Sequence, residues 1–181
     1  HWKVPATVLR EDLLPLIKSD PSYLTAHHYE MVDWQGNNLE QKVLDAIDWS
    51  ELEVDQFPGL LRQKPGPWNP LGRLKFMFPN PYAIYMHDTP ARGLFDNRVR
   101  SHSSGCLRVK RPLDLAVWLL TDGEEWDYEK IRKAMQAGEP LRVELEESVP
   151  VHILYWTAWV DEQGKLNFRP DYYLRDVSLE A

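Results

Sequence analysis

One cysteine and one upstream histidine are the residues of this sequence best suited to chemistry. Cys106, the single cysteine of the 181 residues, follows Ser103, Ser104 and Gly105, and His87 precedes all four. A lone thiol has no intramolecular disulfide partner, so it is either packed in the interior or chemically used. A thiol with a pKa of ~8.5 is mostly protonated at neutral pH, but a nearby imidazole raises its thiolate share. The pair therefore predicts nucleophilic catalysis, with inert packing as the alternative.

The residues beside this pair predict supporting roles. Gly105 and Ser104 allow a tight turn whose backbone N–H groups can point at a developing oxyanion. Asp88 can hold the His87 ring in one tautomer, through either its side chain or its backbone carbonyl. The order of the pair disfavours a papain-like peptidase, because those enzymes place the cysteine first and the histidine far downstream.

Two other histidines compete for the role of base. His102 lies in the polar stretch before Cys106 and is expected to be an exposed loop residue. His152 lies between Val151 and Ile153, and an apolar run predicts a buried, hydrogen-bonded histidine.

Strands with helices inserted between them are predicted to position these residues. Helices are expected over residues 5–19, from Asp20, and over 39–47, 112–120 and 126–136. Strands are expected over 29–33, 73–79, 82–86, 141–145, 151–160 and 165–169. The short connections at 79–82 and 161–164 favour antiparallel pairing. The prolines and glycines of residues 62–72 predict an irregular loop, either a lid over the site or a plain surface loop.

Charge is unevenly distributed along the chain. The net charge is −7, yet Lys and Arg outnumber Asp and Glu between His87 and Pro112. A basic patch around the nucleophile of an acidic protein favours a substrate with carboxylates. Nucleic acid is disfavoured because no basic stripe extends further. No stretch is long and apolar enough to cross a bilayer, and no metal or cofactor is expected.

The motifs around both residues resemble the YkuD-type L,D-transpeptidase signature. That signature is a histidine before a small or acidic residue and threonine, matched by 87–89, and a Gly-Cys-aliphatic-Arg run, matched by 105–108. The sequence is most similar to the large Gram-negative murein L,D-transpeptidases, which share the motifs at residues 67–76, 84–90, 103–106 and 155–158. The wider family has a histidine where this chain has Ser104, so the role of that histidine is not assigned to Ser104. The subgroup of large Gram-negative enzymes resembles this chain in having serine at that position.

The resemblance implies a fold. It is an α+β fold, mainly a β sandwich of mixed and antiparallel sheets with inserted helices and a partly helical lid subdomain. Residues 1–181 are then a single catalytic domain with 34–72 as a lid insertion. Strands normally precede His1 in that family, so an N-terminally truncated domain with an exposed sheet edge is expected.

The resemblance also implies a reaction. A periplasmic enzyme would form 3→3 peptidoglycan cross-links through a thioester on Cys106, with His87 as acid and base and the N–H groups of Gly105 and Cys106 holding the oxyanion. Arg108 would anchor the loop or a substrate carboxylate, while Tyr85, Ser104 and Trp68 would line the donor groove or lid.

The expected partners are the donor tetrapeptide stem and an acceptor stem, with carbapenem-type β-lactams as covalent inhibitors and roles in cell-wall biogenesis and cell shape. The alternatives are an L,D-carboxypeptidase, a transferase onto a protein lysine, and a non-catalytic peptidoglycan-binding module.

Overall fold

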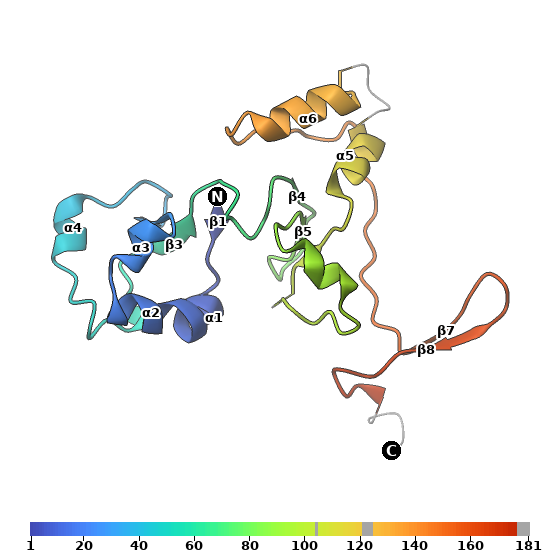
Figure 1. Cartoon of the computed structure of the whole chain (residues 1–181), viewed down its shortest axis with the longest axis horizontal. Coiled ribbons are helices and arrows are strands. Elements are labelled where there is room, and N and C mark those ends of the chain that lie inside the picture. Colours follow the sequence, from blue (N-terminus) through green and yellow to red (C-terminus); the bar gives the residue numbers. More distant parts are fainter. Residues whose placement is uncertain (104, 121–124, 177–181) are drawn as a thin grey trace. The chain divides into compact units, whose positions relative to one another are not determined.

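The structure is a computed structural model that describes residues 1–103, 105–120 and 125–176 (Figure 1). The chain divides into two compact units, His1–Glu146 and Glu147–Ala181. Helices and short strands alternate along it, which confirms the α+β class. Among the described residues, no helix has the length and apolar character needed to cross a membrane.

A helical segment over residues 6–19 opens the first unit, as predicted. It consists of α1 (Ala6–Val8), a π-helical turn (Leu9–Leu13) and α2 (Leu14–Ser19). Pro15 has no N–H for the helical ladder, and the wider π turn directly before it accommodates this break. The predicted apolar stripe is buried: Leu9, Leu13, Leu14 and Ile17.

A three-stranded antiparallel sheet packs with this helical segment. It is formed by β1 (Trp2–Lys3), β3 (Leu60–Gln63) and β2 (Tyr29–Val32), in the order β1-β3-β2. The short helices α3 (Tyr23–Ala26) and α4 (Gln41–Asp45) and a 3₁₀ turn (Val54–Gln56) connect these elements.

The main apolar core lies between the helical segment and this sheet. Ile17 and Leu61 are almost completely buried, and Met31, Leu52 and Phe57 join them in one cluster. Burying each such side chain contributes about 1.5–3 kcal/mol. The core therefore holds residues 1–63 together.

That second sheet carries the predicted site. It contains β4 (Lys75–Phe76), β5 (Met86–His87) and β6 (Leu107–Arg108), in the order β4-β5-β6. The β4–β5 pair is antiparallel, as predicted, but β5 and β6 are parallel. The long connection between β5 and β6, which includes a 3₁₀ turn at Arg92–Asp96, returns the chain to the same end of the sheet and so allows parallel pairing. The resulting sheet is mixed.

Two helices complete the first unit. Helix α5 spans Pro112–Leu120, as predicted, with proline in its first turn. Helix α6 spans Tyr128–Gln136, and the Asp127 side chain caps it by accepting a hydrogen bond of 2.7 Å from the backbone N–H of Lys130. The predicted stop of α5 at Asp122 and Gly123 lies outside the described residues.

The C-terminal region has fewer strands than expected. Strand β7 (Ala158–Val160) pairs antiparallel with β8 (Leu166–Phe168) across the predicted turn at 161–164. Residues 141–145 and 151–157 form no strand in the structure. Without a covering sheet, His152 is exposed, so the prediction that it is buried was wrong. Apolar side chains such as Ile153, Leu154 and Trp156 also remain on the surface.

Candidate active site

Sheet pairing places five side chains on one face of the second sheet. Lys75 on β4 is paired with His87 on β5, and His87 is paired with Arg108 on β6. Paired residues share a face, and so do residues two positions apart along a strand. Tyr85 and Cys106 stand two positions before His87 and Arg108, so they join the same face. We call these five residues the site face.

His87 is held in one tautomer by its neighbour. The ring is buried, with 5% of the residue exposed, and its Nδ1 contacts the backbone carbonyl oxygen of Asp88. A carbonyl can only accept, so Nδ1 carries the hydrogen and, in the neutral ring, Nε2 carries the lone pair. Burial lowers the pKa of His87 below 6.5, the Asp88 contact raises it, and the charge of Arg108 lowers it further. The net lowering favours a neutral imidazole at pH 7, ready to accept a proton.

The Asp88 carboxylate supports the loop before β4. Its Oδ2 accepts a hydrogen bond of 2.9 Å from the backbone N–H of Arg73, and its Oδ1 forms an ion pair with Arg92. Gly72 adopts a positive φ of 60°, and a β-carbon added there would lie 2.4 Å from the Asp88 carboxyl group. Of the two means considered for orienting His87, the structure therefore uses the backbone carbonyl of Asp88.

The loop at 64–72 is ordered by a buried asparagine. Asn69 donates from its side chain to the carbonyls of Gln63 and Lys64, and it accepts a hydrogen bond of 2.9 Å from the backbone N–H of Leu71. Trp68 stacks on His28 with ring centroids 3.6 Å apart. The structure thus places Trp68 against the N-terminal helical region and not on the site face.

Cys106 is partly exposed and lies beside Tyr85. The backbone N–H of Leu107 donates to the Tyr85 carbonyl at 3.0 Å, which aligns the two chains at this point. Burial and then the negative charge of a Cys106 thiolate raise the pKa of Tyr85 to about 12. The phenol therefore keeps its proton at neutral pH.

Cys106 and His87 are diagonal neighbours on the site face. Cys106 lies across from Tyr85, and His87 is the next residue along on that face, with its ring centroid 5.8 Å from that of Tyr85. No direct hydrogen bond joins the two side chains within the described part of the chain. Catalytic hydrogen bonds of this kind are commonly long in unliganded sites and shorten when substrate binds.

The turn before Cys106 has the conformation expected for glycine. Gly105 has a φ of 138°, in the range that side chains disfavour. Its N–H donates to the Ser103 hydroxyl at 3.2 Å, so this bond has to open before Gly105 can donate to an oxyanion. Ser104, predicted to contact substrate, lies outside the described residues.

Arg108 braces the loop that carries the thiol. Its Nη2 donates to the His102 carbonyl at 3.0 Å, while its buried Nε has no hydrogen-bond partner among the described residues. The side chain thus anchors the loop and leaves one donor unused on the site face. The His102 side chain is exposed, as predicted.

Sequence reasoning missed Lys75 as a member of the site. Its ammonium nitrogen lies 3.7 Å from the Tyr85 ring centroid, close enough for a cation–π contact. The residue lies within a predicted strand, but only the pairing with β5 reveals which side chains it joins.

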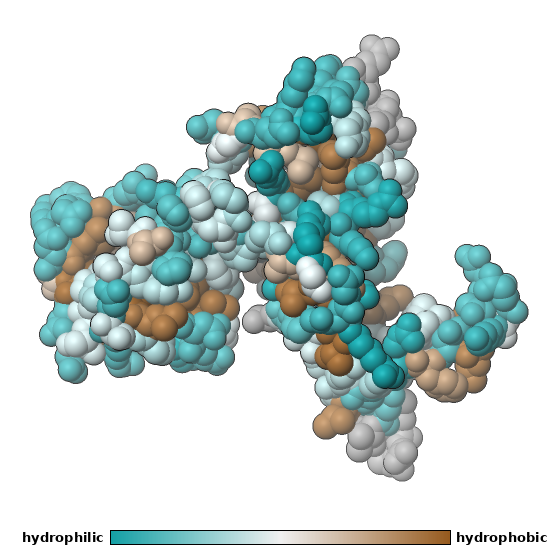
Figure 2. Space-filling view, viewed as in Figure 1, coloured by the Kyte–Doolittle hydropathy of each residue, from teal (hydrophilic) through white to brown (hydrophobic). Residues whose placement is uncertain are grey.

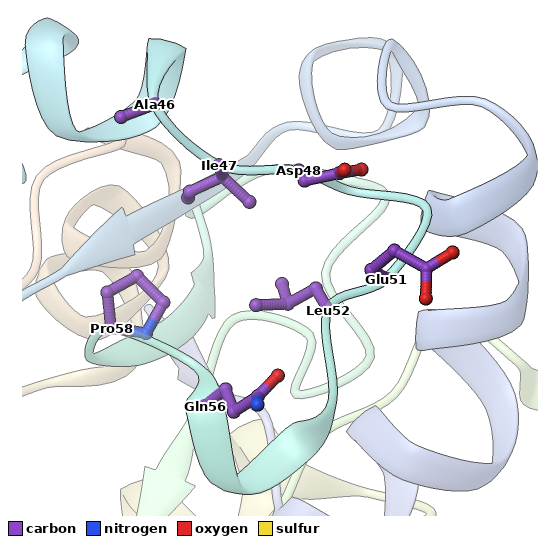
Figure 3. Close-up of a pocket in the computed structure, with 7 residues that line it drawn as sticks. All are labelled: Ala46, Ile47, Asp48, Glu51, Leu52, Gln56 and Pro58. Atoms are coloured by element: carbon purple, nitrogen blue, oxygen red, sulfur yellow. The ribbon is translucent and has the colours of Figure 1, made fainter.

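A cavity of about 280 Å³ lies elsewhere in the first unit (Figure 3). Its lining residues come from the chain between α4 and β3: Ala46, Ile47, Asp48, Glu51, Leu52, Gln56 and Pro58. The site-face residues do not line it. The described residues contain no group of three or more His, Cys, Asp or Glu placed to hold a metal ion.

Comparisons with known proteins identify the family of the chain. Residues 1–151 match the family model of the YkuD L,D-transpeptidase catalytic domain. The chain is 38% identical over 178 residues to a curated Haemophilus influenzae protein provisionally named an L,D-transpeptidase. That match covers 98% of this chain but 35% of the relative, so the chain spans about a third of the relative's length. The chain therefore belongs to the YkuD family of L,D-transpeptidase catalytic domains.

Proposed function

We propose that this chain carries the cysteine centre of a periplasmic L,D-transpeptidase that forms 3→3 cross-links between peptidoglycan stem peptides. The observation that carries the proposal is the site face, where a partly exposed thiol lies across from Tyr85 and diagonally from a buried imidazole. Family membership supplies the reaction class.

The first half-reaction transfers an acyl group to Cys106. Neutral His87 accepts the thiol proton at Nε2, and the sulfur attacks the carbonyl that joins the L-centre of diaminopimelate to D-Ala at stem position four. The N–H groups of Cys106 and Gly105 hold the oxyanion. The carbonyl–nitrogen bond then breaks, and the imidazolium gives its proton to the departing D-Ala amine, leaving a thioester.

The second half-reaction releases the acyl group to an acceptor. The side-chain amine of diaminopimelate on another stem attacks the thioester carbonyl, while His87 takes the proton from that amine. The carbonyl–sulfur bond breaks and the thiol is restored. Arg108 keeps the loop in place, and its positive charge would attract a carboxylate of the substrate.

The proposal includes a single catalytic domain over residues 1–181, with 34–72 as its lid. The strand pairings bear on how such a lid would be connected to the rest of the chain. Strand β3 falls inside 34–72 and pairs with both β1 and β2, so this segment is continuous with the N-terminal helices through a shared core. Any movement of 34–72 would therefore carry residues 1–33 with it. Trp68 lies in this segment and, stacked on His28, would move with it.

The decisive experiment is product analysis with a disaccharide tetrapeptide. A cross-linked dimer with loss of D-Ala supports the proposal, whereas tripeptide monomer alone indicates an L,D-carboxypeptidase. Products that appear only when an outer-membrane protein is supplied indicate transfer to a lysine. Binding without turnover, unchanged in Cys106→Ala, indicates a non-catalytic peptidoglycan-binding module. His87→Gln serves as a second inactive control, because it removes the base but keeps the thiol.

A further inference from the structure

The turn between β4 and β5 is built around the side chain of Asn80. Its amide nitrogen donates to the carbonyls of Phe78 and Ile84 at 3.0 and 2.7 Å. Its amide oxygen accepts from the backbone N–H groups of Tyr82 and Ile84 at 3.1 and 3.0 Å. Both hydrogens and both lone pairs of the amide are therefore used, and both backbone polar groups of Ile84 are bonded to it.

This turn holds a backbone conformation that a side chain disfavours. Ala83 has a φ of 53°, in the left-handed region. The residues on either side of it, Tyr82 and Ile84, are the two whose N–H groups bond to Asn80. A strained residue persists only where its surroundings fix it, and such strain is concentrated at functional sites. The Asn80 amide therefore fixes the position of Ile84, two residues before β5.

The side chain of Ile84 packs against Gly105. A β-carbon added at Gly105 would lie 3.4 Å from Cγ1 and 3.5 Å from Cδ1 of Ile84, which is ordinary van der Waals contact. Strand pairing supports the same placement independently. Met86 is paired with Leu107 in the parallel β5–β6 ladder, so two residues earlier the same register brings Ile84 level with Gly105. A chain of contacts therefore runs from Asn80 through Ile84 to Gly105.

Gly105 has few other contacts that could hold its conformation. It is exposed, and glycine has more backbone freedom than any other residue. Apart from its chain neighbours, only Ile84 among the described residues has atoms within 4 Å of the added β-carbon. The N–H of Gly105 bonds to the Ser103 hydroxyl at 3.2 Å, and that bond has to open when an oxyanion forms. During the reaction, Ile84 is therefore the packing contact that remains.

We propose that Asn80 is a positioning residue for the oxyanion donor Gly105, acting through Ile84. This inference rests on the proposed function, in which the N–H of Gly105 stabilises the oxyanion of the tetrahedral intermediate. Such a donor is effective only when it is already in place, because reorganising it during the reaction costs free energy. Asn80 touches no reacting atom. It fixes the backbone of Ile84, and the side chain of Ile84 limits the positions that Gly105 can take.

Two reactions of the same sulfur test the proposal. In alkylation by iodoacetamide, a sulfur–carbon bond forms, iodide leaves and the thiol proton goes to solvent, so no oxyanion arises. In acylation by p-nitrophenyl acetate, the sulfur attacks the ester carbonyl, an oxyanion forms, p-nitrophenolate leaves and a thioester remains. Cys106 is the single cysteine of the sequence, so intact mass gives both rates, with Cys106→Ala as the background from other nucleophiles. The ratio of acylation to alkylation rates at one pH measures oxyanion stabilisation separately from thiol reactivity.

Loss of the Asn80–Ile84 support should lower this ratio. Asn80→Ala and Ile84→Ala should each lower it about tenfold, less than the ~100-fold or greater loss expected when an oxyanion donor is removed. Ile84→Val keeps Cγ1, the nearer atom, and should keep the ratio. Tyr82→Ala is the matched control, because it removes a side chain that is 77% exposed in the same turn and keeps the N–H bonded to Asn80.

A purely structural role for Asn80 predicts a different result. Stability would fall and both rates would change together, which leaves the ratio unchanged. An unchanged ratio in either Asn80→Ala or Ile84→Ala, or an equal decrease in Tyr82→Ala, overturns the proposal. Thermal melting confirms that each variant is folded. If Asn80→Ala does not fold, Asn80→Asp, which loses both donated hydrogen bonds, is judged by the same criteria.

Failure of this inference and failure of the proposed function are distinguishable. Neither iodoacetamide nor the ester requires peptidoglycan, so a missing product in the tetrapeptide assay leaves the measured ratio valid. Conversely, an unchanged ratio removes the role of Asn80 and leaves the acyl transfer through Cys106 and His87 intact.

Discussion

Gly72 and Asp88 are in contact across the sheet edge. A β-carbon added at Gly72 would lie 2.4 Å from Oδ2 of Asp88, and the same oxygen accepts the backbone N–H of Arg73. The turn before β4 is therefore built around the carboxylate that comes directly after β5. Through this contact, the loop at 64–72 and the backbone that orients His87 form one structural unit.

Gly72→Ala should destabilise the protein. The positive φ costs a side chain about 1–2 kcal/mol, and displacement of the Asp88 carboxylate adds to this. Chemical denaturation of the variant measures the loss. Gly93→Ala is the matched control, because no atom lies within 4 Å of its added carbon. Equal stability of the two variants would contradict this close packing of Gly72 on Asp88.

Asp88→Ala should affect stability more than the tautomer of His87. It removes the acceptor for the Arg73 N–H and the partner of Arg92, which we expect to cost about 1–3 kcal/mol. Asp88→Asn keeps an accepting oxygen and should lose less. Both variants keep the backbone carbonyl that holds Nδ1, and thermal or chemical unfolding separates their effects. Turnover of Asp88→Asn as low as that of His87→Gln would show instead that the side chain orients the ring.

The acidic limb of the activity profile should lie below pH 6.5. His87 has to be neutral to accept the thiol proton, and burial lowers its pKa below 6.5. Activity should therefore be maximal above pH 6.5 on this side of the profile. It should be lost as the pH falls through the lowered pKa of His87. The pH dependence of kcat/KM measures this limb. Removing the charge of Asp88 should move the limb to still lower pH, because that charge raises the pKa of His87. A limb above pH 6.5 would exclude His87 as the base.

Carbapenem-type β-lactams should acylate Cys106. The sulfur attacks the lactam carbonyl, the ring carbon–nitrogen bond opens, and the nitrogen takes a proton, so the protein gains the whole mass of the inhibitor. Intact mass spectrometry measures the adduct, which should be missing in Cys106→Ala. His87→Gln should form the adduct more slowly by a factor of about 100 or more, as expected for loss of a general base. A folded, reduced protein that forms no adduct would contradict the prediction.

Local sequence signals predicted the helices and the terminal hairpin well. Helix α5 spans Pro112–Leu120, as the apolar pattern and Pro112 indicated, and the stripe from Leu9 to Ile17 is buried. These features depend on side-chain periodicity and turn residues within a few positions of one another. In contrast, residues 151–157 have a strand pattern but form no strand, because a strand also needs a pairing partner that periodicity cannot supply. Figure 2 shows apolar patches that remain on the surface of the molecule.

The amino-acid sequence alone determined which residues could do chemistry here: a single thiol after a glycine turn, and an imidazole at the end of a strand. Tertiary structure decided how they are held. The β4–β5 and β5–β6 pairings brought Lys75 and Arg108 beside them, and the Asp88 backbone, not its carboxylate, contacts the imidazole. Residue type sets the reactivity of a group, but pairing between distant strands sets its neighbours, its charge surroundings and therefore its protonation.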